Sequence, residues 1–240
     1  MAEQSAIVRA LVVVAHPDDP EFSVGGTVAT LSAAGTVVTY CVITDGDAGG
    51  SDRSAARSDV AATRRREQTA AGRVLGVRDI RFLGYKDGEL EATVALRRDV
   101  SRVIRQVRPT LVLVHSPERN WSRLCEIHPD HLAAGEASMA AVFPDAGNPF
   151  AHPQLLEDEG LEPWSATETW LFGSPTPNHW VDVTESVDRQ LAALREHHSQ
   201  TDQMADLGGW LRGREIADAV RAQLPAGRLA EAFMRIDTGC

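Results

Sequence analysis

The chain has 240 residues, with 24 Lys and Arg against 34 Asp and Glu, eight His and three Cys. This length suits one α/β domain, and 43% hydrophobic with 24% charged residues excludes a wholly disordered chain. The net charge of −10 argues against nucleic acid and against an anionic membrane as partners. No apolar run approaches the ~20 residues that a membrane span needs.

The first ten residues, MAEQSAIVRA, lack the basic start and long apolar stretch of a secretory signal. Cys41, Cys125 and Cys240 are odd in number, widely spaced and without a CxxC pair. This spacing argues against a disulfide framework and against a structural zinc knuckle. We therefore expect a cytoplasmic location.

Strand-like and helix-like segments alternate over the first two-thirds of the chain. We expect strands at 7–15, 36–44, 80–83, 110–115 and 167–172. We expect helices at 27–34, 59–75, 91–107, from about 129 onward, at 187–197 and at 216–224. A loop rich in Gly, Asp and Ser is expected at 45–58, and the segment 143–166 is expected to cover the surface.

This alternation predicts an α/β fold with a mostly parallel sheet and helices on both faces. No linker divides the chain, so we expect a single domain over residues 1–240. Its core is expected at 7–200, with a helical and strand extension at 201–240. In an open parallel sheet, ligands bind at the carboxyl ends of the strands.

The first predicted strand ends in His16-Pro17-Asp18-Asp19, where a dinucleotide-binding fold would carry a glycine-rich turn. Carboxylates at this place would repel a phosphate and attract a cation. The same residues also suit the acidic start of a helix, because Asp favours the cap position and Glu21 the first turn. The cluster taken alone is compatible with either interpretation, a cation site or a helix cap.

A second cluster, His128-Pro129-Asp130-His131, follows the strand at 110–115, so we expect both clusters at one edge of the sheet. If a helix begins at Pro129, His128 and His131 can face the same way. Two His and one carboxylate are a common catalytic zinc set, which leaves one position for water. Zinc lowers the pKa of that water to about 7. Spare carboxylates and imidazoles can then act as base and acid.

The paired H-P-D-D and H-P-D-H motifs resemble the LmbE-like, or PIG-L, zinc N-deacetylases. Weaker matches accompany them: Arg64-x-x-Glu67, Leu75-Gly76-Val77, Phe82-Leu83-Gly84-Tyr85-x-Asp87-Gly88 and His197-x-Ser199-Gln200. The resemblance implies a Rossmann-like fold and a zinc-dependent hydrolase that removes an N-acetyl group from an amino sugar, such as N-acetylglucosamine, or its conjugate. It also implies one zinc per chain and a tendency to form homo-oligomers. Iron and cobalt are alternative metals, because nitrogen and oxygen ligands discriminate weakly between divalent ions.

The same resemblance implies roles for the motif residues. His16, Asp19 and His131 would bind the zinc. Asp18 would be the base that activates water, and His128 would stabilise the tetrahedral intermediate and protonate the leaving amine. Asp130 would orient an imidazole, preferably that of His128.

Substrate contacts are implied for Arg64 and Asp87. Arg64 also lies in a run of three arginines, which suits a solvated helix face, and Asp87-Gly88 is also a common turn dipeptide. Trp121 lies in a polar loop and is the best candidate for stacking on a sugar, whereas Trp164 and Trp170 are expected to pack in the interior.

Two positions depart from the family's pattern. Pro20 separates the Asp pair from Glu21, and Glu126 stands where the mycothiol-pathway branch has Tyr. Three other histidines have no motif: His115, His152 and His179. The alternatives are an amidase on a thiol conjugate or an antibiotic-pathway intermediate, a non-catalytic metal-binding member of the family, and a nucleotide-binding protein.

Overall fold

A computed structural model describes residues 7–50, 52 and 54–239. Residues 1–6, part of the segment from which the absence of a secretory signal was argued, lie outside this range. So do Cys240 and two positions of the predicted loop, 51 and 53. Among the helices that are described, none is both long and apolar enough to cross a bilayer.

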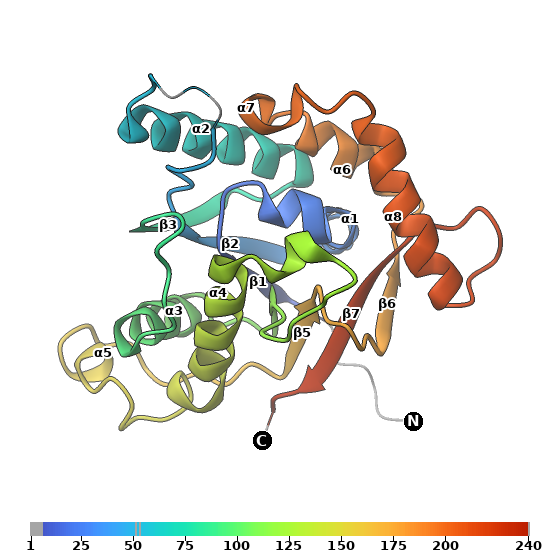
Figure 1. Ribbon diagram of the computed structural model, residues 1–240. Coiled ribbons are helices and arrows are strands. Elements are labelled where there is room, and N and C mark those ends of the chain that lie inside the picture. The colour runs from blue at the N-terminus through green and yellow to red at the C-terminus, as the bar shows by residue number, and fades with distance from the viewer. Residues whose placement is uncertain (1–6, 51, 53, 240) are drawn as a thin grey trace.

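A seven-stranded sheet in the order β3-β2-β1-β4-β5-β7-β6 forms the centre of the molecule (Figure 1). The strands are β1 (Arg9–Val14), β2 (Val37–Thr44), β3 (Asp79–Tyr85), β4 (Leu111–His115), β5 (Glu168–Phe172), β6 (His179–Asp182) and β7 (Ala230–Asp237). From β3 to β5 the neighbours pair in parallel, whereas β7 is antiparallel to both β5 and β6. The predicted α/β fold with a mostly parallel sheet is confirmed.

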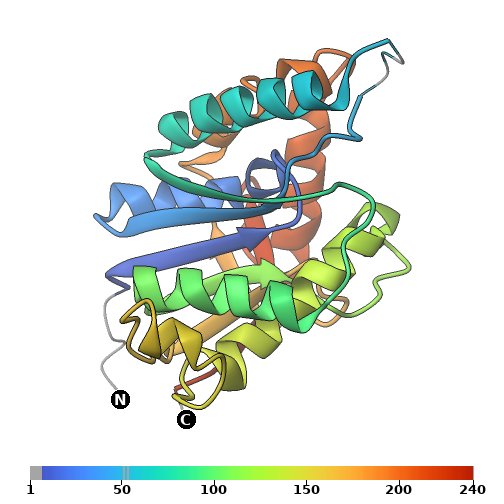
Figure 2. The same cartoon turned by 90° about the vertical axis from the view of Figure 1, so that its left-hand side faces the viewer.

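Helices cover both faces of the sheet (Figure 2). They are α1 (Asp19–Ala33), α2 (Arg57–Leu75), α3 (Val94–Val107), α4 (Pro129–Ala140), α5 (Gln154–Glu157), α6 (Val187–Leu194), α7 (His198–Thr201) and α8 (Leu207–Arg221), with the short helical turns η1 (Leu124–Ile127) and η2 (Ala141–Asp145). Because side chains alternate along a strand, Leu11 and Val13 of β1 pack toward α3 and α4, and Val12 and Val14 pack toward α1, α2 and α6.

Helix α1 begins eight residues before the predicted start at Thr27, so that boundary was wrong. The pair Gly25-Gly26 lowers helix propensity and favoured a turn at this place. Packing explains the glycines, because a Cβ atom on Gly25 would lie 2.7 Å from Cγ of Gln190, and one on Gly26 would lie 2.7 Å from Cβ of Val183. The helix therefore depends on glycine where it meets the segment around α6.

Gly26→Ala is expected to lower the free energy of unfolding by about 1–3 kcal/mol, because the buried Val183 and the neighbouring Gln190 must move. Gly213→Ala is the matched control, since Gly213 is an exposed position of α8 with no atom within 4 Å of its added Cβ. The control is expected to gain up to about 1 kcal/mol from helix propensity. Urea unfolding measures the free energy of unfolding of both variants. An equal change in the two variants would contradict the packing explanation of Gly26.

The last third of the chain differs most from the prediction. Helix α8 begins at Leu207 and not at Ile216, and the side chain of Asp206 caps it by accepting the N–H of Gly209 at 2.8 Å. The antiparallel strands β6 and β7 were not located individually. Trp170 is buried in β5, as expected, and Trp164 packs against the core and donates from Nε1 to the Pro109 carbonyl at 2.7 Å.

A carboxylate is buried between α8 and β7. Glu215 is 2% exposed, and neither of its carboxylate oxygens has a hydrogen-bond partner among the described residues. Burial, followed by the charge of Glu231, raises the pKa of Glu215 to about 8, against the lowering effect of Arg214 and Arg212. The folded protein therefore holds a proton on Glu215 that an unfolded chain releases near pH 4.5.

The free energy of unfolding is expected to fall as pH rises from 4.5 to 8, by up to about 1.4 kcal/mol per pH unit from this group. Below pH 4.5 Glu215 is protonated in both the folded and the unfolded protein, and above pH 8 it is ionised in both. Glu215 therefore makes the free energy of unfolding depend on pH only between these two values. Glu215→Gln should flatten this slope because an amide stays neutral, whereas the exposed Glu157→Gln should leave it unchanged. Urea unfolding at pH 5 to 8 measures the slope, and equal slopes in wild type and Glu215→Gln would exclude this role.

Candidate active site

The two H-P-D motifs meet at the carboxyl edge of the sheet. His16 follows β1, Asp19 opens α1 and His131 lies in the first turn of α4. Nδ1 of His16 lies 3.3 Å from Nε2 of His131 and 3.5 Å from a carboxylate oxygen of Asp19. Nε2 of His131 lies 3.2 Å from the other oxygen of Asp19. Three side chains from two distant motifs thus bring their ligand atoms close together.

These separations fit a tetrahedral metal ion. Ligands that bind zinc at about 2.0–2.2 Å in a tetrahedron lie roughly 3.3–3.6 Å apart. A carboxylate and two imidazole nitrogens are also the donor types that such a site uses. The structure therefore provides a candidate His/Asp metal site, and the residues present fit the ion.

Two carboxylates fix the orientation of His16. Its Nε2 lies 3.0 Å from Oδ1 of Asp87 and 3.2 Å from Oδ2 of Asp130, so we assign the proton to Nε2 and leave the lone pair of Nδ1 facing the metal site. A carboxylate behind a ligating imidazole is the usual support for a metal-binding His. Burial alone would lower the pKa of His16, but Asp19, Asp130 and Asp87 raise it to about 12. The metal-free protein therefore holds a second proton on this ring, which must leave before Nδ1 can bind a metal.

Asp130 lies against an imidazole, but against that of His16 and not that of His128. Its carboxylate contacts His16 and accepts the backbone N–H groups of Gly88 and Leu90, at 2.7 and 3.3 Å. Asp130 contacts His128, the imidazole that we expected it to orient, only through its backbone N–H, which donates to Nδ1 of His128 at 3.2 Å. The loop that follows β3 supplies these N–H groups, and the spacing within H-P-D-H carries no information about that loop.

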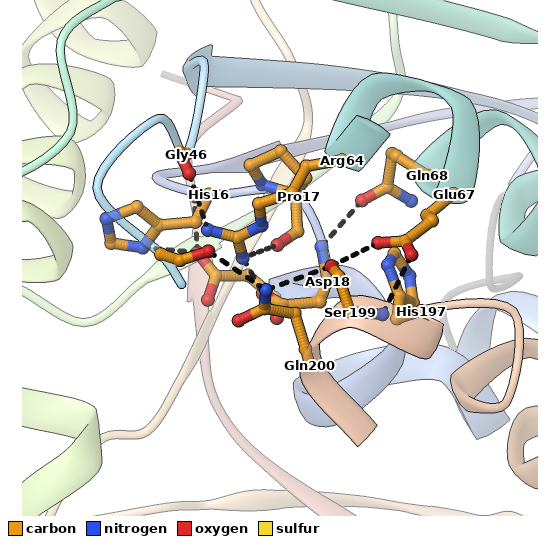
Figure 3. Close-up of polar contacts among 12 residues, drawn as sticks. His16, Pro17, Asp18, Gly46, Arg64, Glu67, Gln68, His197, Ser199 and Gln200 are labelled. Carbon is orange, nitrogen blue, oxygen red and sulfur yellow. Dashed lines mark hydrogen bonds and ion pairs between the residues drawn. The ribbon is translucent and has the colours of Figure 1, made fainter. Parts of the chain in front are cut away.

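Asp18 has a strained backbone, with a φ of 91° in the left-handed region. It occupies the cap position of α1, but its side chain makes no capping hydrogen bond. Its carboxylate instead lies 3.0 Å from Nη2 of Arg64, and its N–H donates to Oε1 of Gln68 at 2.8 Å (Figure 3). Helix α2 thus holds both the backbone and the carboxylate of Asp18.

Arg64 is buried, unlike a residue of a solvated helix face. Its guanidinium donates to the carbonyls of Pro17 at 2.6 Å and Gly46 at 3.1 Å, in addition to the ion pair with Asp18 (Figure 3). The loop after β2 must pass close to it, since a Cβ atom on Gly46 or Gly49 would collide with the guanidinium. Arg64 therefore fastens the loop that carries Asp18 to the loop that follows β2.

His128 is the exposed member of the cluster. Its ring lies 5.0 Å from that of His16 and 5.4 Å from that of His131, measured between centroids. Because Nδ1 accepts the Asp130 N–H, we assign its proton to Nε2, which is left to donate elsewhere. Burial, then the nearby charges of His16 and His131, lowers the pKa of His128.

The two adjacent aspartates have opposite electrostatic environments. Burial raises the pKa of Asp18, although the Arg64 guanidinium opposes the rise. For Asp19, the imidazoles of His131, His16 and His115 outweigh burial and hold the pKa well below its usual range. Two neighbouring carboxylates whose pKa values are shifted in opposite directions are suited to different chemical tasks.

Two supporting groups were not predicted from the sequence. His115, at the end of β4, was left unassigned; its Nε2 lies 3.1 Å from Asp19, and its ring stacks on that of His131 with centroids 4.2 Å apart. Gln68 lies one helical turn after Arg64, a spacing that puts both on one face of α2 and could have indicated it. The amide of Gln68 also donates to Glu21 at 3.0 Å.

The remaining sequence-based candidates lie in different surroundings. His197 is buried, and its Nε2 lies 3.0 Å from Glu21, so it supports the first turn of α1. His152 pairs with Asp145 at 3.0 Å, and the ring of His179 packs against Trp170 with centroids 4.5 Å apart. Trp121 is 73% exposed, with the Arg119 guanidinium 5.7 Å from the centroid of its ring.

Comparison with known proteins identifies the family of this arrangement. Residues 11–142 match the PIG-L family model, described as GlcNAc-PI de-N-acetylase. The chain is 34% identical to a diacetylchitobiose deacetylase of Thermococcus kodakarensis, over 81% of this chain and 70% of the relative. It is 30% identical to a probable N-acetyl-alpha-D-glucosaminyl L-malate deacetylase 2 of Bacillus cereus, over 82% of this chain and 85% of the relative.

The fold agrees with these similarities. The N,N'-diacetylchitobiose deacetylase from Pyrococcus horikoshii superposes with a TM-score of 0.88 at 31% identity, over 96% of this chain and 84% of that chain. The comparisons therefore favour the deacetylase interpretation over the nucleotide-binding alternative. The chain belongs to the PIG-L family, as the two H-P-D motifs indicated, and it is a deacetylase that hydrolyses an amide C–N bond.

Proposed function

We propose that the protein is a zinc-dependent N-deacetylase that removes the acetyl group from a conjugate of N-acetylglucosamine. The observation that carries the proposal is the convergence of His16, Asp19 and His131, whose ligand atoms lie 3.2–3.5 Å apart. The relatives at 34% and 30% identity are named for N-acetylglucosamine compounds, which supports this substrate class.

The metal and the base have separate tasks in this proposal. Zinc, when bound by His16, Asp19 and His131, supplies a Lewis acid that lowers the pKa of water and polarises the amide carbonyl. Asp18 accepts the proton of the attacking water while the oxygen forms its bond to the carbonyl carbon. The raised pKa of Asp18 and its fixed backbone both support this assignment.

His128 acts on the other side of the reacting amide. Its Nε2–H donates a hydrogen bond to the oxygen on which negative charge develops. When the C–N bond breaks, the Nε2 proton of His128 passes to the amine nitrogen and the proton held by Asp18 restores the imidazole, so that both groups return to their starting states. Acetic acid leaves as the second product and ionises to acetate in water. The exposed position of His128 beside the ligand cluster supports this role.

Asp130, Asp87 and Arg64 support the reacting groups in this scheme. Asp130 and Asp87 hold the His16 ring, and Arg64 holds the Asp18 carboxylate. Substrate contact by Arg64 and Asp87 stays a prediction. One zinc per chain, a cytoplasmic location and a homo-oligomer also stay predictions.

Release of acetate tests the function. The purified protein loaded with one equivalent of zinc is expected to release acetate from N-acetylglucosamine and from N,N'-diacetylchitobiose. Removal of the metal with a chelator should abolish the activity, and zinc should restore it. A zinc-loaded protein that deacetylates neither these sugars nor their glycosides would refute the proposal.

A further inference from the structure

A cleft of about 650 Å³ opens beside the metal site, and Asp19 and His131 form part of its wall. This volume is in the range of pockets that bury drug-sized ligands, ~300–1,000 Å³. The rest of the wall comes from α1, η1, the segment before α8 and α8 itself, the helix that packs against β7 and β6 (Figure 1). A group attached to the reacting amide or to its sugar can therefore enter this cleft.

The lining beyond the metal ligands is mostly apolar. Its apolar members are Phe22, Leu124, Cys125, Met204, Trp210 and Ala217. Trp210 meets Phe22 edge to face, with ring centroids 5.4 Å apart, and remains 43% exposed. Leu124 is 74% exposed. Large apolar side chains that stay open to solvent in a cleft indicate a ligand surface.

The charged groups of the cleft already have partners. Arg214 pairs with Glu126 at 3.1 Å and donates to the Phe22 carbonyl at 2.7 Å. Arg123 pairs with Asp218 at 2.8 Å. Both cations of the lining are thus neutralised by ion pairs within the chain. A phosphate or carboxylate on the substrate would meet cations that already pair with Glu126 and Asp218, whereas an apolar group leaves these pairs undisturbed.

We propose that this cleft binds an apolar substituent of the amino-sugar substrate, an aryl or alkyl group that packs against Trp210. The inference rests on the proposed function and names its substrate class. The substituent can be carried at the anomeric carbon of the sugar or by the acyl group itself. Both sources share the same chemistry, and the substrates below distinguish them.

The first experiment compares matched substrates. Phenyl N-acetylglucosaminide is expected to show a KM about tenfold lower than the methyl glycoside if the substituent is at the anomeric carbon. N-hexanoyl-glucosamine is expected to show a similar gain over N-acetylglucosamine if the acyl group enters the cleft. Equal kinetics in both comparisons would overturn the inference, as would a larger gain from a malate glycoside than from the phenyl glycoside.

The second experiment assigns the preference to Trp210. Trp210→Ala should reduce the tenfold preference to less than about threefold, and Trp210→Phe should restore most of it. Ile216→Ala is the matched control, because Ile216 is an exposed apolar residue of the same helix, 50% exposed, outside the cleft lining. If Trp210→Ala keeps the full preference, the cleft is not the binding site.

A binding measurement separates this inference from the proposed function. Phenyl β-glucoside, which has no acetamide group, is expected to bind the zinc-loaded protein in calorimetry, about tenfold more tightly than to Trp210→Ala. Binding without any deacetylation would overturn the proposed function and support the cleft. Deacetylation of N-acetylglucosamine, with neither binding of the phenyl glucoside nor a gain from the hexanoyl chain, would overturn the inference alone.

Discussion

Asp18→Asn is expected to retain its zinc and to lose activity by a factor of about 100 to 10,000, the usual contribution of a general base. Asn is the appropriate replacement because Asp18 has a φ of 91°, and Asn tolerates the left-handed region better than Ala does. The amide cannot accept the proton of the attacking water. Initial rates and elemental analysis on the same sample measure both quantities.

The control for this variant is Asp45→Asn, a carboxylate that pairs with Arg65 in the loop after β2. It should keep both its zinc and its activity. An active, zinc-loaded Asp18→Asn enzyme would remove the assignment of Asp18 as the base. A loss of zinc in Asp18→Asn would instead make Asp18 a metal ligand.

His131→Ala is expected to lose its zinc and, with it, all measurable activity. Only His16 and Asp19 remain as ligands of the predicted set, and two ligands hold zinc weakly after dialysis. Asp130→Asn, which weakens the support of His16, is expected to lower zinc affinity by a smaller factor of about 10 to 100. Elemental analysis and competition with a chromophoric chelator measure the affinities.

His198→Ala is the matched control, because its side chain is 68% exposed and pairs only with Asp202 among the described residues. It should bind zinc like the wild type. A full equivalent of zinc in His131→Ala would refute the ligand assignment, and zinc loss of similar size in His198→Ala would show that the assay does not report on the site.

Much of the sheet could be predicted from the sequence, because its central strands are buried on both faces and therefore continuously apolar. Strand β1 is apolar throughout Ala10–Val14, and the structure buries all of that segment. Strands β6 and β7 carry no such signal. All four residues of β6 are only partly buried, and in β7 the charged Glu231, Arg235 and Asp237 interrupt the apolar residues.

The candidate site was predictable where neighbours in sequence are neighbours in space. The H-P-D-D and H-P-D-H motifs each place two or three functional side chains within one turn of a helix start. Contacts between distant segments were not predictable. Asp87 and Asp130 share the same imidazole nitrogen of His16, and Gln68 reaches the Asp18 N–H from another helix. Sequence spacing does not predict these contacts, because they depend on how α2, α4 and the loop after β3 pack against one another.

The position of β7 between β5 and β6 has a consequence for synthesis on the ribosome. Strand β5 ends at Phe172, and the strand that covers its edge ends at Asp237, ~65 residues later. At ~5–20 residues per second, the edge of β5 stays without this partner for roughly 3–13 s. An uncovered strand edge can pair with a second chain. Strand β7 therefore does more than complete the sheet, because its pairing with β5 also closes an edge at which two newly made chains could associate.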